Sequence, residues 1–265
     1  MTDSLFPRVI AHRGIVSGNY AGNSHRAIEE ALNSPVEGIE VDVRLSKDGI
    51  PFIFHDGLLE NSTNGTGRPE DKTWHQLKEI EYTQNPDHHS TLILLEDVLK
   101  MVGSHKFLFL HAKDRGGFGR PLAHGIVRLI EKYHLQKSII IESFNPFFLR
   151  VVRLKSKDIT ILYDFKIDTK SAQEEAHPDR IPWAFKQPFI QKQIVRLLRP
   201  DLLGPHWGIG HDLLAHFVRH NYPMMCWTVD DSVVAERLFS AGIMGVKSDC
   251  PLKIMEIFIT RHAPY

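Results

Sequence analysis

The fold is decided by the stretch Gly38-Ile-Glu-Val-Asp-Val-Arg-Leu-Ser-Lys-Asp-Gly-Ile-Pro-Phe-Ile-Phe-His55. Two runs rich in β-branched and aromatic residues, Gly38–Leu45 and Pro51–His55, flank the polar segment Ser46–Gly49. A Lys-Asp-Gly turn between two such runs is typical of a hairpin. We therefore expect the second run to fold back antiparallel to the first and to pair about Lys47–Asp48, which places His55 opposite about Val41.

Outside this stretch, strand-like and helical patterns alternate along the chain. The strand-like runs are Val9–Ala11, Lys106–Ala112, Ser138–Phe144, Thr160–Phe165, Leu202–Trp207, Met224–Val229 and Gly245–Ser248. The helical patterns are Asn23–Leu32, Leu94–Val102, Pro121–His134, Pro146–Lys155, Gln191–Leu198, His211–His220, Ser232–Ala241 and Leu252–Arg261. Asn23, Asn145 and Asp231 stand where N-caps are expected. Sustained alternation with nearly continuous apolar strands indicates parallel βαβ units, whose sheet is covered on both faces.

The number of these elements favours a closed barrel. With the hairpin included, the chain holds nine strand-like runs and eight helical patterns, one strand more than a (β/α)8 barrel needs. Eight barrel strands remain if Pro51–His55 is only the returning arm of the hairpin. A doubly wound open sheet is the alternative, but no Gly-x-Gly-x-x-Gly motif follows the first strand. We expect an α/β fold, a TIM barrel with a hairpin extension after its second strand.

One segment interrupts the alternation and is expected to leave the barrel. It covers about residues 57–91 and contains Asn64-Gly-Thr-Gly67 and a short helical stretch near Trp74–Ile80. A connection of this length can wall one side of a site. Because no repeat, low-complexity tract or linker interrupts the chain, we expect a single domain over residues 1–265.

Composition excludes several classes of protein. The 32 Lys and Arg residues balance 32 Asp and Glu residues, so the surface charge of a general nucleic-acid binder is missing. No apolar run is long enough to span a membrane, and the first residues lack the features of a signal peptide, so we expect no stable membrane insertion. Cys226 and Cys250 do not form a disulfide framework. These features predict a reduced, soluble, cytoplasmic protein, and its 16 histidines are the one compositional oddity.

The polar residues at the predicted strand ends suggest the chemistry, because barrel enzymes carry their sites at the carboxyl ends of the strands. These residues are His12 and Arg13 after the first strand, Glu40 and Asp42 on the second, His55 ending the hairpin, and His111 and Lys113 on the third barrel strand. Paired carboxylates suit a divalent cation, with His111 as a further ligand. Two histidines suit general acid and base catalysis, while Arg13 and Lys113 suit phosphate oxygens. Together they predict metal-assisted cleavage of a phosphoester.

Each residue also has a structural interpretation when it is taken alone. A strand-end histidine can be a hydrogen-bonded structural group, and a Glu-x-Asp pair can be a solvated or salt-bridged face. Arg13 could close the barrel through an ion pair with Asp42 or Asp249. The catalytic interpretation is favoured because all seven residues fall at the same end of successive strands.

Six segments resemble the signature of the glycerophosphodiester phosphodiesterase family in order and spacing. They are Val9–Gly14, Gly38–Asp56, Thr63–Gly67, Ile141–Asn145, Cys226–Asp231 and Gly245–Pro251. The resemblance implies the following roles: His12 and His55 as the acid/base pair, Glu40 and Asp42 as ligands of Ca²⁺ or Mg²⁺, Arg13 and Lys113 as phosphate ligands, and Trp227 as a wall of the substrate cleft. It also implies that a glycerol hydroxyl attacks phosphorus and that water then opens the cyclic phosphate.

The chain departs from the family pattern at two positions. Gly22 replaces the glutamate of the usual Glu-Asn-Thr motif, and His111 replaces the glutamate of the usual Glu-x-Lys motif. An imidazole in place of a carboxylate removes a charge and a hard ligand from the cation site, so Mn²⁺, Co²⁺ or Zn²⁺ become alternatives to Mg²⁺ or Ca²⁺. We expect a shifted metal preference or a weakened enzyme.

Three hypotheses follow for the activity. The first is hydrolysis of a small-molecule phosphodiester such as glycerophosphocholine or glycerophosphoethanolamine. The second is a phosphodiesterase acting on a lysophospholipid or another specialised phosphodiester, with Phe118, Phe144–Phe148 and Trp183–Phe189 as an apolar groove. The third is a barrel that binds phosphodiester or metal without turnover.

Overall fold

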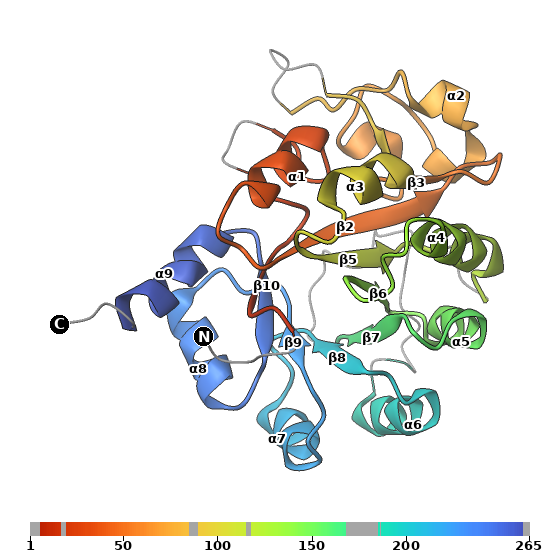
Figure 1. Ribbon diagram of the computed structural model, residues 1–265. Helices are drawn as coiled ribbons and strands as arrows, with labels where there is room; N and C mark the ends of the chain where they lie inside the picture. Colours follow the sequence, from red (N-terminus) through yellow and green to blue (C-terminus); the bar gives the residue numbers. More distant parts are fainter. Residues whose placement is uncertain are drawn as a thin grey trace.

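The computed structural model describes residues 6–16, 20–84, 90–114, 118–167, 185 and 187–261. Within these ranges, eight parallel strands form a barrel (Figure 1). In their order around the barrel they are β1 (Val9–Ala11), β2 (Gly38–Leu45), β5 (Phe107–Ala112), β6 (Ile139–Ser143), β7 (Thr160–Phe165), β8 (Leu202–Pro205), β9 (Met225–Cys226) and β10 (Gly245–Ser248). β10 pairs with β1, and the bridges Leu203–Met224 and His206–Trp227 join β8 to the β9 segment. The expected TIM barrel is therefore confirmed.

The helices lie outside the strands (Figure 1) and match the predicted ranges closely. They are α1 (His25–Leu32), α3 (Leu95–Val102), α4 (Arg120–Lys132), α5 (Pro146–Lys155), α6 (Pro188–Leu198), α7 (His211–Arg219), α8 (Ser232–Ser240) and α9 (Pro251–Arg261). None of the described helices combines the length and the apolar character needed to cross a membrane.

Two of the three predicted N-caps are confirmed and one is wrong. Asn145 accepts hydrogen bonds from the first turn of α5, and Asp231 does the same for α8. The N-cap of α1 is Ser24, whose hydroxyl accepts from the backbone N–H of Ala27. Asn23 has a left-handed backbone (φ 65°) instead of the extended one of an N-cap. This conformation leaves its side chain to bind β2.

The hairpin is confirmed with the expected register. β3 (Pro51–Ile53) runs antiparallel to β2 and pairs Val43 with Ile53 and Leu45 with Pro51. The short strand β4 (Ile93–Leu94) pairs with β3 in turn. Phe54 donates its backbone N–H to the carbonyl of Asp42, so the chain after β3 returns to the strand end that carries the carboxylates.

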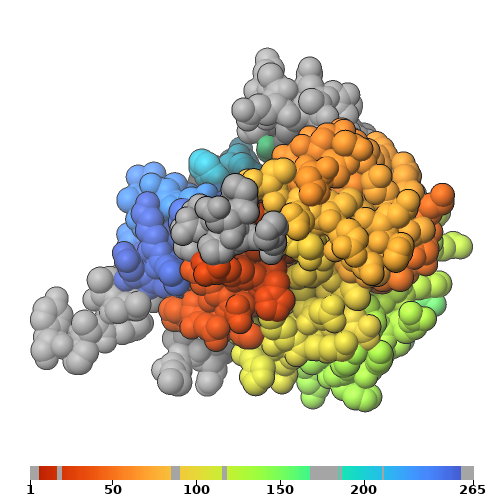
Figure 2. All heavy atoms as spheres, turned by 90° about the horizontal axis from the view of Figure 1, so that it is seen from above, coloured from red at the N-terminus to blue at the C-terminus, as the bar shows by residue number. Residues whose placement is uncertain are grey.

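The excursion between β3 and β4 packs on a small core of its own. It contains η1 (Leu59–Asn61), η2 (Pro69–Asp71) and α2 (Trp74–Leu77). The core residues are Ala21, Phe52, Phe54, Leu59, Leu77, Ile80, Tyr82 and Leu92. In the space-filling view of Figure 2, the excursion lies on the side of the molecule opposite to α9. It holds the end of the hairpin against the barrel.

The barrel interior changes from apolar to charged along the strands. Its apolar layer consists of Ile10, Phe109, Ile140, Leu162, Leu202 and Met225. Because side chains alternate between the two faces of a strand, the residue two positions later shares the inward face. Two positions after the residues of the apolar layer stand His12, His111, Glu142, Asp164, Gly204 and Trp227. The remaining two strands, β2 and β10, contribute the buried side chains of Glu40 and Lys247. The ionisable groups therefore gather above a closed apolar floor.

Candidate active site

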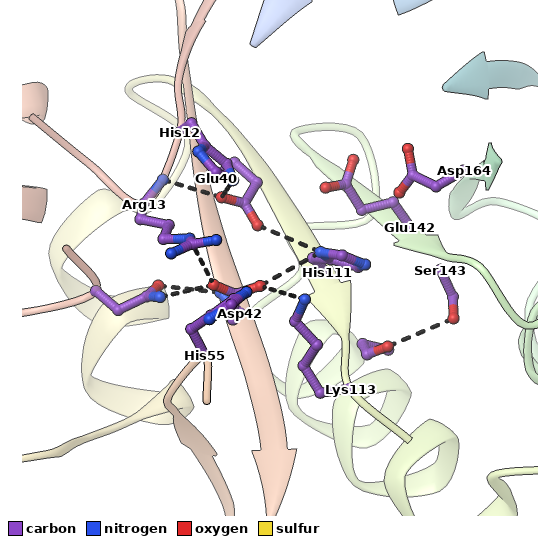
Figure 3. Close-up of polar contacts among 12 residues, drawn as sticks. His12, Arg13, Glu40, Asp42, His55, His111, Lys113, Glu142, Ser143 and Asp164 are labelled. Carbon is purple, nitrogen blue, oxygen red and sulfur yellow. Dashed lines mark hydrogen bonds and ion pairs between the residues drawn. The ribbon is translucent and has the colours of Figure 1, made fainter. Parts of the chain in front are cut away.

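The predicted site residues come together at the carboxyl end of the barrel (Figure 3). Figure 3 shows His12, Arg13, Glu40, Asp42, His55, His111 and Lys113 around the middle of β2. Glu40 and Asp42 share the inward face of β2, and Asp42 pairs in register with His111 of β5. The parallel register thus delivers carboxylates and imidazoles from neighbouring strands to one place.

Asp42 is the centre of the charged contacts. Its Oδ1 atom lies 3.1 Å from Lys113 Nζ and 3.3 Å from His111 Nδ1, and its Oδ2 atom lies 3.3 Å from Arg13 Nε. Asn23 Nδ2 donates to Oδ2 at 2.7 Å, and the backbone N–H of Asp42 donates back to Asn23 Oδ1. Burial opposes ionisation of this carboxyl, but Lys113 and the other cationic neighbours outweigh it and hold its pKa well below the usual range. The Arg13–Asp42 ion pair considered from the sequence is therefore present, as part of a larger cluster.

Glu40 is buried but less well compensated. Its Oε2 atom accepts the backbone N–H of Arg13 at 2.9 Å, and its Oε1 atom lies 3.8 Å from His111 Nδ1. Burial and the nearby Asp42 carboxylate raise the pKa of Glu40 well above its ordinary value. A cation placed beside Oε1 would favour the ionised form.

His12 is oriented by a carboxylate from the last strand. His12 Nδ1 lies 2.6 Å from Asp249 Oδ1, and His12 Nε2 lies 3.9 Å from Glu40 Oε2. Burial opposes ionisation of Asp249, but its hydrogen bond with His12 prevails and lowers the pKa of the carboxyl. An ionised Asp249 accepts a hydrogen bond from Nδ1–H and so turns Nε2 toward the site.

His55 is held in a second pair of the same kind. His55 Nδ1 lies 2.8 Å from Asp56 Oδ1. Arg44 Nη2 donates to the carbonyl oxygen of His55 at 2.7 Å, and the same buried guanidinium forms an ion pair with Glu70 of the excursion. Burial, followed by the charge of Lys113, lowers the pKa of His55 to about 4. The hairpin and the excursion thus fix the second histidine.

One group of three side chains in the described part of the chain has the geometry of a cation site. Glu40, His111 and Glu142 each offer one ligand atom, and these atoms lie within 4.8 Å of one another. Glu40 Oε1, His111 Nε2 and Glu142 Oε1 are buried and make no hydrogen bond to any described residue. Two carboxylates and an imidazole are a donor set that Mn²⁺, Zn²⁺ or Co²⁺ accepts, so the residues fit a divalent cation.

Glu142 was not among the candidate ligands predicted from the sequence, and Asp42 is absent from this group of three. A sequence signal for Glu142 does exist, since it is the one charged residue within the apolar run Ile139–Ser143. Both oxygens of Asp42 already contact other side chains, Oδ1 those of Lys113 and His111 and Oδ2 that of Arg13. Its role as a cation ligand stays a prediction.

Aromatic side chains wall the site on the side of β6 and β9. Phe144 lies between His111 and Trp227, with 5.4 Å between the ring centroids in each pair. The Trp227 indole donates to the carbonyl oxygen of Gly204 at 2.8 Å and contacts the ring of His206. These contacts place Trp227 at the mouth of the barrel, and its role in a substrate cleft stays a prediction.

Fold and site define a barrel whose carboxyl end combines two His–Asp pairs, two cationic side chains and a potential cation site. Residues 12–253 match the sequence model of the glycerophosphoryl diester phosphodiesterase family. A glycerophosphodiester phosphodiesterase of Caldanaerobacter subterraneus is 25% identical over 253 residues, which cover 94% of this chain and 96% of that protein.

Solved structures agree with this match at the level of the fold. A phosphodiesterase of Oleispira antarctica, solved in complex with the product sn-glycerol-3-phosphate, superposes with a TM-score of 0.81. It is 24% identical, and the match covers 96% of this chain and 97% of that one. A glycerophosphodiester phosphodiesterase of Parabacteroides distasonis gives a TM-score of 0.76 at 22% identity, with 97% and 98% of the two chains covered.

The chain belongs to the glycerophosphoryl diester phosphodiesterase family. Its enzyme class is accordingly that of a phosphoric diester hydrolase.

Proposed function

We propose that this chain hydrolyses small glycerophosphodiesters to an alcohol and glycerol phosphate, with His12 and His55 as the proton-transfer pair. The observation that carries the proposal is the pairing of each imidazole with its own carboxylate, Asp249 for His12 and Asp56 for His55. With Nδ1 engaged in both rings, Nε2 is the nitrogen that we assign to proton transfer. The product bound in the Oleispira antarctica enzyme supports a substrate of this kind.

In the proposed reaction, a glycerol hydroxyl of the substrate attacks phosphorus and the alcohol group departs. One histidine accepts the hydroxyl proton and the other donates a proton to the departing oxygen. Water then opens the cyclic phosphate with the roles of the histidines exchanged, so one water is consumed overall. Arg13 and Lys113 hold the phosphate oxygens through charge-assisted hydrogen bonds, and their shared partner Asp42 keeps both side chains in place.

A divalent cation completes the proposed site. We assign Glu40 and His111 as two of its ligands, with a carboxylate of Asp42 or Glu142 as the third. When bound, such an ion supplies Lewis-acid stabilisation of the negative charge that develops on the phosphate oxygens. Loss of the family glutamate at position 111 makes Mn²⁺, Co²⁺ or Zn²⁺ better suited to these ligands than Ca²⁺.

The test is turnover of glycerophosphocholine by the purified chain, with choline and glycerol phosphate both quantified. His12→Ala and His55→Ala should each lower kcat by on the order of 10²- to 10⁴-fold, since each removes one general acid/base group. His124→Ala, on the exposed face of α4, is the matched control and should keep wild-type activity. Unchanged activity in both test variants would eliminate the acid/base assignment.

A lysophospholipid is the second candidate substrate, and one observation favours it. Phe118 and Phe147 are about half exposed, and their rings meet edge to face at 5.6 Å. Phe185 contacts Phe147 at 6.5 Å, whereas Trp183 lies outside the described residues. An acyl chain could lie on this aromatic surface. A Phe118→Ser/Phe147→Ser double variant should then lower turnover of lysophosphatidylcholine while leaving that of glycerophosphocholine unchanged.

The organisation and location of the chain are further parts of the proposal. We retain a single domain over residues 1–265, which the family match to residues 12–253 supports. We also retain a cytoplasmic location. Cys226 and Cys250 are both free, as a reducing compartment would keep them.

A further inference from the structure

Lys247 of β10 reaches across the barrel interior to a carboxylate on the opposite strand, β6. Its ammonium lies 2.6 Å from Glu142 Oε2 and 3.4 Å from Asp164 Oδ1. All three side chains are at most 3% exposed. Gly204 provides the space, because a Cβ atom there would lie 2.0 Å from Asp164 Oδ1. Buried charges are costly to desolvate, and apolar packing would close a barrel at least as well. The triad therefore points to a role beyond stability.

The two carboxylate oxygens of Glu142 have different surroundings. Oε2 binds Lys247, while Oε1 is buried without a hydrogen bond to any described residue, as are Glu40 Oε1 and His111 Nε2. Glu142 is also the register partner of His111 on the adjacent strand. The carboxylate that is missing at position 111 thus has a counterpart one strand away (Figure 3).

We propose that Glu142, rather than Asp42, is the third ligand of the divalent cation, and that Lys247 and Asp164 set how strongly it binds. This deepens the proposed function, because it rests on the cation site assigned there. Lys247 competes with the cation for Glu142. Asp164 offers Lys247 a second carboxylate and so releases Glu142 toward the cation. Lys247 and Asp164 are positioning residues, since neither touches the cation.

The experiment is a titration of the metal-free chain with Mn²⁺, with free Mn²⁺ measured by electron paramagnetic resonance in the absence of substrate. Glu142→Gln should weaken Mn²⁺ binding by at least about tenfold, because it removes a charged ligand. Asp164→Asn should weaken it by about tenfold, because Lys247 then has Glu142 as its remaining carboxylate partner in the triad. Asp201→Asn, which removes a carboxylate paired with Arg153 outside the site, is the matched control and should leave affinity unchanged.

Two double-mutant cycles separate this competition from simple loss of negative charge. Asp164→Asn should have no further effect on Mn²⁺ affinity in a Lys247→Met background, nor in a Glu142→Gln background. The second cycle needs no lysine variant, so it remains informative if Lys247→Met does not fold. Additive effects in either cycle would overturn the roles of Lys247 and Asp164. Wild-type affinity in Glu142→Gln would overturn the ligand assignment.

Binding and turnover distinguish this inference from the proposed function. A chain that binds Mn²⁺ through Glu142 but hydrolyses no glycerophosphodiester contradicts the proposed function alone. A chain that hydrolyses the substrate while Glu142→Gln binds Mn²⁺ normally contradicts the inference alone. Absence of Mn²⁺ binding by the wild type contradicts the inference as well.

Discussion

His12 and Asp249, at the ends of the first and last strands of the barrel, are joined by a hydrogen bond of 2.6 Å between Nδ1 and Oδ1. Closure of the barrel by β1 and β10 is what brings the two residues together. The second histidine, His55, takes its carboxylate from its chain neighbour Asp56. The orientation of His12 therefore depends on the closed barrel, and that of His55 on the local turn.

Asp249→Asn should lower kcat by about 10²-fold or more with little change in KM. An amide can present its NH₂ group to Nδ1 and so favour the wrong tautomer of His12. Steady-state kinetics on glycerophosphocholine measures the effect, and Asp97→Asn on the exposed surface of α3 is the control. A wild-type kcat in Asp249→Asn would contradict orientation of His12 by this carboxylate.

Lys113→Met should lower kcat/KM by roughly 10- to 100-fold, the value of one hydrogen bond to a charged group. Lys113 is only partly buried and lies 3.1 Å from Asp42 Oδ1, within reach of a phosphate at the mouth. Lys100→Met, at an exposed position of α3, controls for loss of a positive charge alone. Equal kcat/KM values in the two variants would contradict the assignment of Lys113 as a phosphate ligand.

The pKa of His55 predicts how stability changes with pH. Its pKa is about 4 in the folded chain and about 6.5 when unfolded, so the unfolded state binds more protons between these values. Stability should therefore fall as pH falls from 6.5 toward 4. Between pH 7 and pH 4.5, the free energy of unfolding should fall by about 2 kcal/mol less in His55→Gln than in the wild type, because the variant lacks this titrating group. Urea unfolding at both pH values measures this, and equal losses would show that His55 is not buried in its neutral form.

Metal removal and replacement test the substitution at position 111. A chelator should abolish hydrolysis, and Mn²⁺ should restore it better than Mg²⁺ or Ca²⁺, because His111 offers nitrogen where the family pattern has a carboxylate oxygen. His111→Glu should raise the activity measured with Mg²⁺ by at least severalfold. Strict dependence of the wild type on Ca²⁺ would contradict a shifted preference, and no gain in His111→Glu would contradict the ligand assignment.

Arg44→Met should destabilise the chain by about 3 to 5 kcal/mol, because it removes the buried guanidinium that forms an ion pair with the buried Glu70 carboxylate. It also removes the donor to the His55 carbonyl. Thermal and urea unfolding give the stability. A double variant, Arg44→Met/Glu70→Leu, should recover part of the loss because it removes the buried carboxylate as well. If it recovers none, packing rather than charge explains the effect.

The hairpin and the barrel were predictable because the relevant signals are local. Strand and helix patterns, together with the turn Ser46–Gly49, act over a few residues and therefore survive in the sequence. The register followed from the same turn, and the pairing of Val43 with Ile53 agrees with it. The N-cap of α1 was misplaced by one residue because the left-handed conformation of Asn23 serves a contact with Asp42, which no local pattern reveals.

The alternation of strands and helices follows from local sequence patterns, and with it the set of residues that stand at strand ends. His12, Arg13, Glu40, Asp42, His55, His111 and Lys113 were identified in this way, since the carboxyl ends of parallel strands meet at one end of a barrel. Which of these charged side chains pair with one another, and with which further residues, depends on the three-dimensional fold. Asp249 reaches His12, and Lys247 reaches Glu142, across strands that are distant in the chain. Such pairings depend on barrel closure and on burial, which strengthens electrostatic interactions by removing water. Neither of the two pairings, His12 with Asp249 or Lys247 with Glu142, produces a periodic pattern in the sequence.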